Sequence, residues 1–254
     1  MNEKKIKIIA LISARYNSRR LPGKALISYN KKNAIDRIIE NLKNSKYINK
    51  IIVATSNHKS DDKIIRYCKK RGYNYSKGSR FNLFKRFIDA AQKYSPKIIV
   101  RVTGDNPFTS YEITDFMIKK HIKKKADFTF MNKEKLPVGV CPEIIDFFSI
   151  KKMLTYKLNF GYSEYMTYYF KNNPKFFNLN YLKPPKKFEL KNKKARLTLD
   201  YKEDLIFHKK LDKYVSVLKK PLTLSKIYGV LNNYPRLAKL NSTIKQKYNN
   251  SNIK

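Results

Sequence analysis

Cysteine and histidine are scarce in this chain of 254 residues, and their scarcity argues against two kinds of protein. The only cysteines, Cys68 and Cys141, lack a Cys-x-x-Cys spacing, and the three histidines are scattered. Neither a zinc site nor a disulfide framework is indicated, which favours the reducing cytosol. An apolar run near the N-terminus ends at Arg15 without a small-residue cleavage site, and no later run is long enough to span a bilayer. We therefore expect a cytoplasmic protein without a membrane partner.

Acidic residues are also few, 19 against 57 lysines and arginines, so the formal net charge is +38 and the isoelectric point is near 10.1. Such a charge is typical of proteins that bind nucleic acid or an anionic surface. The lysines, however, are spread along the whole chain together with abundant Asn, Ile, Tyr and Phe, a pattern that A/T-rich codons also produce. We favour the compositional explanation, which makes nucleic acid an unlikely partner despite the charge.

Apolar runs rich in β-branched residues alternate with amphipathic stretches. This spacing predicts an α/β fold with a Rossmann-like, mostly parallel sheet flanked by helices on both faces. Expected strands cover residues 7–12, 50–56, 73–76, 97–102, 126–131, 144–148, 176–182 and 196–199. Expected helices cover residues 33–44, 60–71, 82–94, 110–124, 163–172, 203–214 and 223–231, with a short helix after 149. Asn33, Ser60 and Ser149 are expected N-caps, and Gly72 an expected C-cap. We assign residues 1–240 to a single domain and 241–254 to a polar, frayed tail.

The loop after the first strand concentrates positive charge. It reads Ala14-Arg15-Tyr16-Asn17-Ser18-Arg19-Arg20-Leu21-Pro22-Gly23-Lys24. Arginine grips phosphate oxygens two at a time, lysine adds a point charge and a tight turn frees backbone amides, so the loop predicts a polyphosphate cradle. It follows neither the P-loop nor the dinucleotide-binding pattern. It lies at the carboxyl end of a strand, where ligands of parallel sheets bind.

This loop resembles the signature loop of the cytidylyltransferases that activate sugars with CTP. That family includes the acylneuraminate, keto-deoxy-octulosonate and spore-coat-polysaccharide types, and the chain is most similar to the last. The family loop reads roughly Ala-Arg-x-Gly-Ser-x-Arg-Leu-Pro-Gly-Lys. The matching residues are Ala14, Arg15, Ser18, Arg20, Leu21, Pro22, Gly23 and Lys24. Asn17 replaces a glycine, and the loop shape can survive because asparagine tolerates positive φ.

Two aspartates follow predicted strands in motifs that are similar to the same family. Asp105 lies in Val102-Thr103-Gly104-Asp105-Asn106-Pro107, and Asp200 lies in Arg196-Leu197-Thr198-Leu199-Asp200. The resemblance implies that both bind Mg²⁺, which takes few protein oxygens and keeps several waters. Without the resemblance, Asp105 belongs to an ordinary Gly-Asp turn and Asp200 is an N-cap of the next helix.

A third motif, Gly78-Ser79-Arg80-Phe81-Asn82-Leu83-Phe84-Lys85-Arg86-Phe87, resembles the family segment beside the base and ribose. The resemblance implies that Gly78, Ser79 and Arg86 bind the nucleotide and that Ser56, at a strand end, lines the base pocket. Read alone, Ser79 and Asn82 are ordinary residues of a helix start. Only seven glycines occur, yet the matched motifs contain four of them, Gly23, Gly78, Gly104 and Gly139, where close backbone approach would be needed.

The segment that would bind the acceptor sugar departs from the family pattern. The spore-coat type often reads Pro-Asp-Gly-x-Asp-x-Glu-x-Phe where this chain reads Pro137-Val138-Gly139-Val140-Cys141-Pro142-Glu143-Ile144-Ile145. Both aspartates are replaced, and Glu143 is left as the candidate substrate contact. Ser163-Glu164-Tyr165-Met166-Thr167 resembles the family's Glu-His-Val-Thr helix with tyrosine in place of histidine. We interpret Tyr165, Tyr168 and Tyr169 as core or dimer surface.

The resemblance therefore predicts a Mg²⁺-dependent nucleotidyltransferase that forms a CMP-activated sugar from CTP and releases pyrophosphate, for surface polysaccharide. Its catalytic residues are Arg15, Arg20, Lys24 and Asp105, and Asp105 and Asp200 hold the metal. Ala14, Ser18 and Gly23 join the nucleotide contacts, and family analogy also suggests a homodimer. Two alternatives stay open. One is a sugar-phosphate transferase that uses another nucleotide such as GTP, and the other is a basic nucleic-acid-binding protein on a degenerate transferase scaffold.

Overall fold

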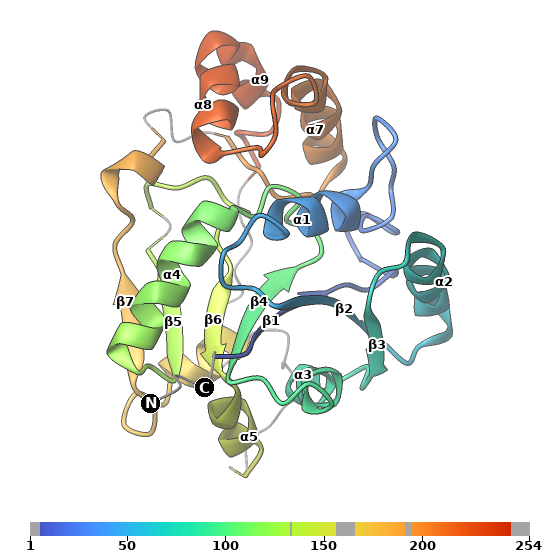
Figure 1. Ribbon diagram of the computed structural model, residues 1–254. Helices are drawn as coiled ribbons and strands as arrows, with labels where there is room; N and C mark the ends of the chain where they lie inside the picture. Colours follow the sequence, from blue (N-terminus) through green and yellow to red (C-terminus); the bar gives the residue numbers. More distant parts are fainter. Residues whose placement is uncertain (1–5, 133, 156–165, 191–194, 245–254) are drawn as a thin grey trace.

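The computed structural model of the protein describes residues 6–132, 134–155, 166–190 and 195–244, and a seven-stranded sheet runs through its centre (Figure 1). The strand order is β3-β2-β1-β4-β6-β5-β7. β6 is antiparallel to both β4 and β5, and all other neighbours are parallel. The prediction of a mostly parallel α/β sheet is thus confirmed. The strands are β1 Ile8–Ser13, β2 Lys50–Ser56, β3 Tyr75–Gly78, β4 Ile98–Thr103, β5 Phe128–Met131, β6 Glu143–Asp146 and β7 Leu179–Leu182.

Helices cover both faces of the sheet (Figure 1). They are α1 Ala34–Leu42, α2 Asp62–Arg71, α3 Leu83–Gln92, α4 Tyr111–Lys124, α5 Phe147–Thr155, α6 Met166–Lys171, α7 Lys202–Val215, α8 Leu224–Asn233 and α9 Pro235–Lys239. Successive strand residues point to opposite faces, so β1 divides its side chains between two cores. Ala10 and Ile12 pack in the core shared with α1, α4 and α7. Ile9 and Leu11 pack in the core shared with α3 and α5.

Local capping signals in the sequence are mostly confirmed. Asn33 accepts a hydrogen bond from the Asp36 amide at the start of α1, and Gly72 ends α2 with φ of 67°. The predicted N-caps Ser60 and Ser149 are wrong. Ser60 lies inside a 3-10 helix, Lys59–Asp61, that precedes α2. Asp146 accepts hydrogen bonds from the amides of residues 148 and 149 instead, which starts α5 earlier.

The C-terminal third departs most from the predictions. Residues 196–199 form no strand of the sheet, only an isolated bridge between Arg196 and Val138, although Leu197 and Leu199 are fully buried. The short helix α9 was not predicted, because five residues are too few to show a periodic pattern. Asn241, which we assigned to the frayed tail, is fully buried. Tyr169 packs in the core as expected, whereas Ser163, Glu164 and Tyr165 lie outside the described residues.

Within the described ranges, no helix combines the length and apolar character needed to cross a membrane.

Two buried histidines predict a pH-dependent stability. Burial lowers the pKa of His121 to about 4 and the pKa of His208 to about 3. Unfolded histidine has a pKa near 6.5, so below that pH the unfolded chain binds protons that the folded chain does not. Stability is therefore present above pH 6.5 and is lost as the pH falls toward 4. Between pH 7 and pH 5 we expect each histidine to lower the free energy of unfolding by about 2 kcal/mol, measured by urea denaturation.

The variant His121→Asn tests the assignment, because it should remove about half of the pH-dependent loss. Equal free energies of unfolding at pH 7 and pH 5 in the unmodified protein would contradict the prediction.

Candidate active site

The candidate site forms where three backbone segments meet at the carboxyl ends of β1 and β4. The Gly104 amide donates to the Ser13 carbonyl at 2.8 Å. A Cβ at Gly104 would lie 2.9 Å from the Ala14 Cβ, closer than carbon atoms approach, so this crossing requires glycine. The Leu199 amide donates to the Asp105 carbonyl at 2.7 Å. These main-chain bonds bring the cationic loop, Asp105 and Asp200 together.

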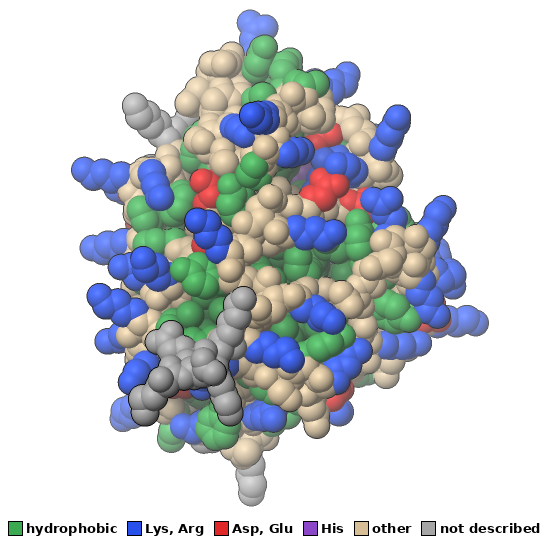
Figure 2. All heavy atoms as spheres, viewed as in Figure 1, with side chains coloured by type: hydrophobic (Ala, Val, Ile, Leu, Met, Phe, Trp, Pro, Cys, Tyr) green, Lys and Arg blue, Asp and Glu red, His purple; other side chains and the backbone are tan. Residues whose placement is uncertain are grey.

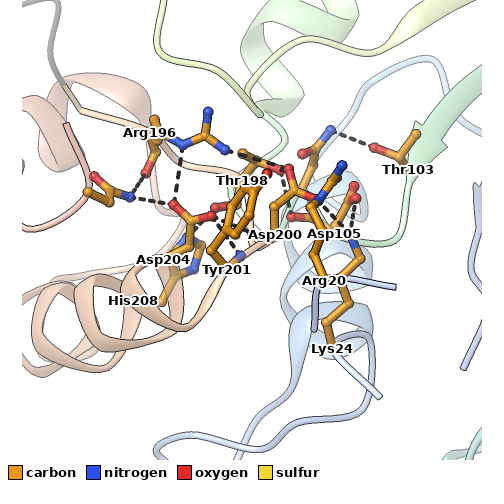
Figure 3. Close-up of polar contacts among 12 residues, drawn as sticks. Arg20, Lys24, Thr103, Asp105, Arg196, Thr198, Asp200, Tyr201, Asp204 and His208 are labelled. Carbon is orange, nitrogen blue, oxygen red and sulfur yellow. Dashed lines mark hydrogen bonds and ion pairs between the residues drawn. The ribbon is translucent and has the colours of Figure 1, made fainter. Parts of the chain in front are cut away.

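Lys24 lies between the two aspartates (Figure 3). Its Nζ is 2.5 Å from Asp105 Oδ2 and 2.8 Å from Asp200 Oδ1. Arg20 Nη2 contacts the same Asp200 oxygen at 2.5 Å. The site is largely shielded from solvent, since the side chains of Lys24, Asp105 and Asp200 are 13%, 21% and 13% exposed. The structure thus brings together four of the residues that the sequence singled out.

The electrostatics keep these groups charged. Burial opposes the charge on Lys24, but the carboxylates of Asp105 and Asp200 outweigh it and raise the pKa of the ammonium. Burial likewise opposes the charge on Asp200, but Lys24 and then Arg20 outweigh it and lower the pKa of that carboxyl. At neutral pH Lys24 and Asp200 are therefore both charged, and their ion pair is strengthened because the side chains are shielded from solvent.

The side chain of Asp200 does not cap the following helix, so that alternative is wrong. Helix α7 begins at Lys202 with Tyr201 in the N-cap position. Asp204, one turn into the helix, accepts from the amides of Asp200 and Tyr201 at 2.9 and 3.1 Å. Asp105 does lie in a turn, with the Asn106 amide bound to the Thr103 carbonyl at 3.1 Å. That turn directs the Asp105 carboxylate to Lys24, so the turn and the functional interpretations are compatible.

The loop before Lys24 is folded around Tyr16. Gly23, with φ of 71°, donates its amide to the Tyr16 carbonyl at 2.8 Å. The Tyr16 amide donates to Asp61 Oδ1 at 2.6 Å. Asn17, which replaces the family's glycine, is not among the positive-φ residues of the described chain. The loop therefore does not need the conformation that we expected asparagine to supply. Ala14 is buried, and its amide bonds the Ala54 carbonyl at 3.2 Å.

Arginines crowd the far side of this loop. Burial lowers the pKa of Arg15, Asp61 partly compensates, and the nearby charges of Arg80 and Arg19 lower it further. Cations placed close together favour an anionic ligand. The arrangement suits the polyphosphate that the sequence predicts.

Two residues that are predicted to contact the nucleotide form hydrogen bonds to other groups of the protein. Ser56 is buried and its hydroxyl donates to Asp61 Oδ2 at 2.5 Å. Arg86 is buried, donates to the carbonyls of Ser79 and Arg80 at 2.7 and 2.9 Å, and has its pKa lowered by burial to about 10. Arg86 thereby shapes the turn after Gly78. The roles of Ser18, Gly78, Ser79, Ser56 and Arg86 toward a nucleotide stay predictions.

Glu143, the predicted substrate contact, forms an ion pair with Arg101 across the β4–β6 pairing, and both side chains are about nine-tenths buried. The neighbouring segment lies against residues 196–199, where the Leu197 amide bonds the Val138 carbonyl at 2.8 Å. Gly139 permits this approach with φ of 102°, since an added Cβ would lie 2.7 Å from the Leu197 carbonyl carbon.

The substitution Gly139→Ala is therefore expected to destabilise the fold. It forces a side chain into a left-handed conformation and against backbone, so we expect a loss of about 2–4 kcal/mol in the free energy of unfolding. Gly229→Ala is the matched control, since Gly229 lies inside α8 with nothing within 4 Å of an added Cβ. There alanine should stabilise by about 0.5–1 kcal/mol. Urea denaturation of both variants measures the difference, and equal effects would contradict the assignment.

Some functional residues were missed by sequence reasoning. Asp61 supports the loop and Ser56, and Asn241 and Asp204 form a buried hydrogen bond behind Asp200. The Asp204 position is part of the family motif, which was a usable signal. Asn241 carries no local signal, because its partners are distant in sequence, and the contact of Asp61 with the Tyr16 amide spans 45 positions.

The donor set fits a divalent cation that keeps several waters. Asp105 and Asp200 contact one and the same Nζ atom, so two carboxylates converge on one point. Among the described residues, no group of three or more His, Cys, Asp or Glu could hold a metal by itself. Two carboxylates completed by water and phosphate oxygens suit Mg²⁺, which rarely uses an all-protein cage.

A mostly parallel sheet with a cationic loop and paired aspartates at its carboxyl edge defines a nucleotidyltransferase. Comparison with known proteins gives the family: the cytidylyltransferase model matches residues 9–239, and the chain belongs to this family.

Similar proteins agree with this assignment. An uncharacterized protein of Methanocaldococcus jannaschii is 32% identical over 95% of this chain and 97% of its own length. The spore coat polysaccharide biosynthesis protein SpsF of Bacillus subtilis is 30% identical over 91% and 96%. The solved structure of a cytidylyltransferase from Leptospira borgpetersenii superposes with a TM-score of 0.81 at 26% identity, covering 96% of this chain and 99% of that one.

Proposed function

We propose that the protein is a Mg²⁺-dependent enzyme that transfers CMP from CTP to a sugar and releases pyrophosphate. The observation that carries the proposal is the contact of Lys24 with both Asp105 and Asp200, beside Arg20. It combines a convergent carboxylate pair with two cations beside the loop where a triphosphate would bind. The family supplies cytidine as the expected base.

In this reaction an oxygen of the sugar attacks the α-phosphorus of CTP in line with the leaving pyrophosphate. The new oxygen–phosphorus bond forms as the bond between the α-phosphorus and the bridging oxygen breaks, and the proton of the attacking hydroxyl is released. Arg15, Arg20 and Lys24 bind the phosphate oxygens and stabilise the negative charge that accumulates on them. Mg²⁺ bound by Asp105 and Asp200 would neutralise phosphate charge.

The Lys24 ammonium has two roles in this proposal. Without ligands its ammonium compensates the two carboxylates, which would otherwise repel each other. Asp105 and Asp200 would hold a divalent cation that supplies this compensation, and the Lys24 ammonium would then be available to bind phosphate oxygens.

The first test is ligand-dependent thermal stability in high salt, which suppresses nonspecific contacts. A ligand that binds only the folded state stabilises it by mass action and raises the melting temperature. CTP with Mg²⁺ at about 100 times its Kd should raise the free energy of unfolding by about 2.7 kcal/mol. We expect this shift with CTP and Mg²⁺ together and not with GTP, UTP or ATP. A shift confined to GTP would favour the sugar-phosphate transferase alternative, and no shift with any nucleotide would contradict the proposal.

The nucleic-acid alternative predicts a different behaviour. Figure 2 shows lysine and arginine side chains spread over the viewed face and its margins, with hydrophobic and acidic groups between them. This scattered pattern supports a compositional origin of the charge rather than a nucleic-acid track. Nucleic-acid binding would weaken steeply with salt and would survive the loss of Asp105.

The proposed pathway is surface polysaccharide or glycan synthesis, supported by the name of the Bacillus subtilis relative. With valine at 138 and cysteine at 141 replacing the family's aspartates, the acceptor sugar is the part to be screened, by pyrophosphate release from CTP. The cytoplasmic location and the homodimer stay predictions.

A further inference from the structure

A buried carboxylate lies directly behind Asp200. Asp204 is fully buried, and both of its oxygens accept hydrogen bonds. Oδ2 accepts from the backbone amides of Asp200 and Tyr201. Oδ1 accepts from Arg196 Nε at 3.3 Å and from Asn241 Nδ2 at 2.8 Å. A buried carboxylate is tolerated only when its oxygens are paired in this way, so removing one donor should disturb the whole arrangement.

Asn241 brings the C-terminal end of the described chain into this network. It follows α9 and is fully buried. Its amide nitrogen donates to Asp204 and also to the Arg196 carbonyl at 3.0 Å. One side chain therefore fixes both the carboxylate and the backbone of the segment that leads to Asp200.

The network controls which oxygen of Asp200 is available. Arg196 Nη2 lies 3.6 Å from Asp200 Oδ2, on the side of the buried network. Oδ1 faces Lys24 and Arg20 instead. The direction of the Asp200 carboxylate thus depends on Arg196 and on the backbone amide that Asp204 holds.

We propose that Asn241 is a positioning residue: through Asp204 and Arg196 it fixes Asp200 in the orientation that binds the divalent cation. The C-terminal segment after α8 is then part of the active-site support rather than a passive extension. This inference rests on the proposed function. It adds to the site a supporting residue that lies more than thirty positions along the chain from the motif of Asp200.

The test compares Asn241→Ala with Tyr228→Phe. Tyr228 lies in the same C-terminal helical layer and donates a buried hydrogen bond to the Phe188 carbonyl at 2.9 Å, but it has no contact with Asp204 among those described. Asn241→Ala loses two buried hydrogen bonds and Tyr228→Phe loses one, so both should lower the melting temperature. Mn²⁺ binding with CTP present is measured by the loss of the free-ion electron paramagnetic resonance signal, after subtraction of the loss that CTP causes without protein. It should weaken about tenfold or more only in Asn241→Ala.

A second variant helps to distinguish the loss of positioning from a folding defect. Asp204→Asn keeps the shape of the side chain but turns an NH₂ group toward groups that donate, so it should weaken Mn²⁺ binding at least as much. Unchanged Mn²⁺ affinity in a folded Asn241→Ala or Asp204→Asn protein would overturn the inference, as would an equal loss in Tyr228→Phe. If the unmodified protein binds no Mn²⁺ with CTP, the proposed function itself fails, and this inference with it.

Discussion

Replacement of Asp105 with asparagine should reduce pyrophosphate release from CTP by about a hundredfold to a thousandfold or more while the fold stays intact. The amide keeps the size of the side chain but removes the negative charge that pairs with Lys24 at 2.5 Å. It also removes one of the two anionic oxygens available to Mg²⁺. The Asp105 backbone carbonyl still accepts from the Leu199 amide, so the crossing of the two segments should persist.

The measurement is steady-state pyrophosphate release, with circular dichroism and melting temperature to verify folding. Asp89→Asn is the matched control, because Asp89 is a partly exposed carboxylate on α3 that pairs only with Lys85 among the described contacts. It should leave turnover within about twofold, since surface pairs contribute little. An Asp105→Asn enzyme with full activity would remove this residue from the mechanism.

Replacement of Lys24 with methionine should give two opposite results. Turnover should fall about a hundredfold or more, because the phosphates lose a cation. Divalent-cation binding in the absence of nucleotide should become tighter than in the unmodified protein. Asp105 and Asp200 both contact Lys24 Nζ, and without it the two like charges lose the cation that bridges them, although Arg20 still pairs with Asp200. A cation would then no longer compete with an ammonium ion.

Isothermal titration with Mn²⁺ and no nucleotide measures the second effect, and Lys85→Met, at an exposed position on α3, is the control. The opposite signs distinguish this prediction from simple damage to the site, which would weaken both properties. If Lys24→Met binds Mn²⁺ more weakly than the unmodified protein, the exchange of Lys24 between carboxylates and phosphates is wrong.

Sequence reasoning succeeded where the information is local. Side-chain caps such as Asn33 and the left-handed Gly72 depend on groups within a few residues, and the strand β2 was predicted with its observed bounds. The meeting of Lys24 with Asp105 was predictable because β1 and β4 are parallel and end at one edge of the sheet, and the family motif placed Asp200 with them.

Sequence reasoning failed where a residue's role depends on distant partners. Residues 196–199 alternate like a strand, but Leu197 and Leu199 pack in two different buried clusters, and the isolated bridge to Val138 replaces pairing within the sheet. Ser149 was a plausible cap, yet Asp146 was closer to the amides that needed an acceptor. Asn241 sits among polar residues that read as a tail, and only the folded chain shows its contact with Asp204.

The bond from the Leu199 amide to the Asp105 carbonyl has a consequence for how this chain can change over generations. Any residue except proline can supply that amide, and every residue can supply that carbonyl. The separation of the two aspartates is therefore insensitive to most substitutions around them. A site that is spaced by main-chain atoms can keep its geometry while the side chains around it change.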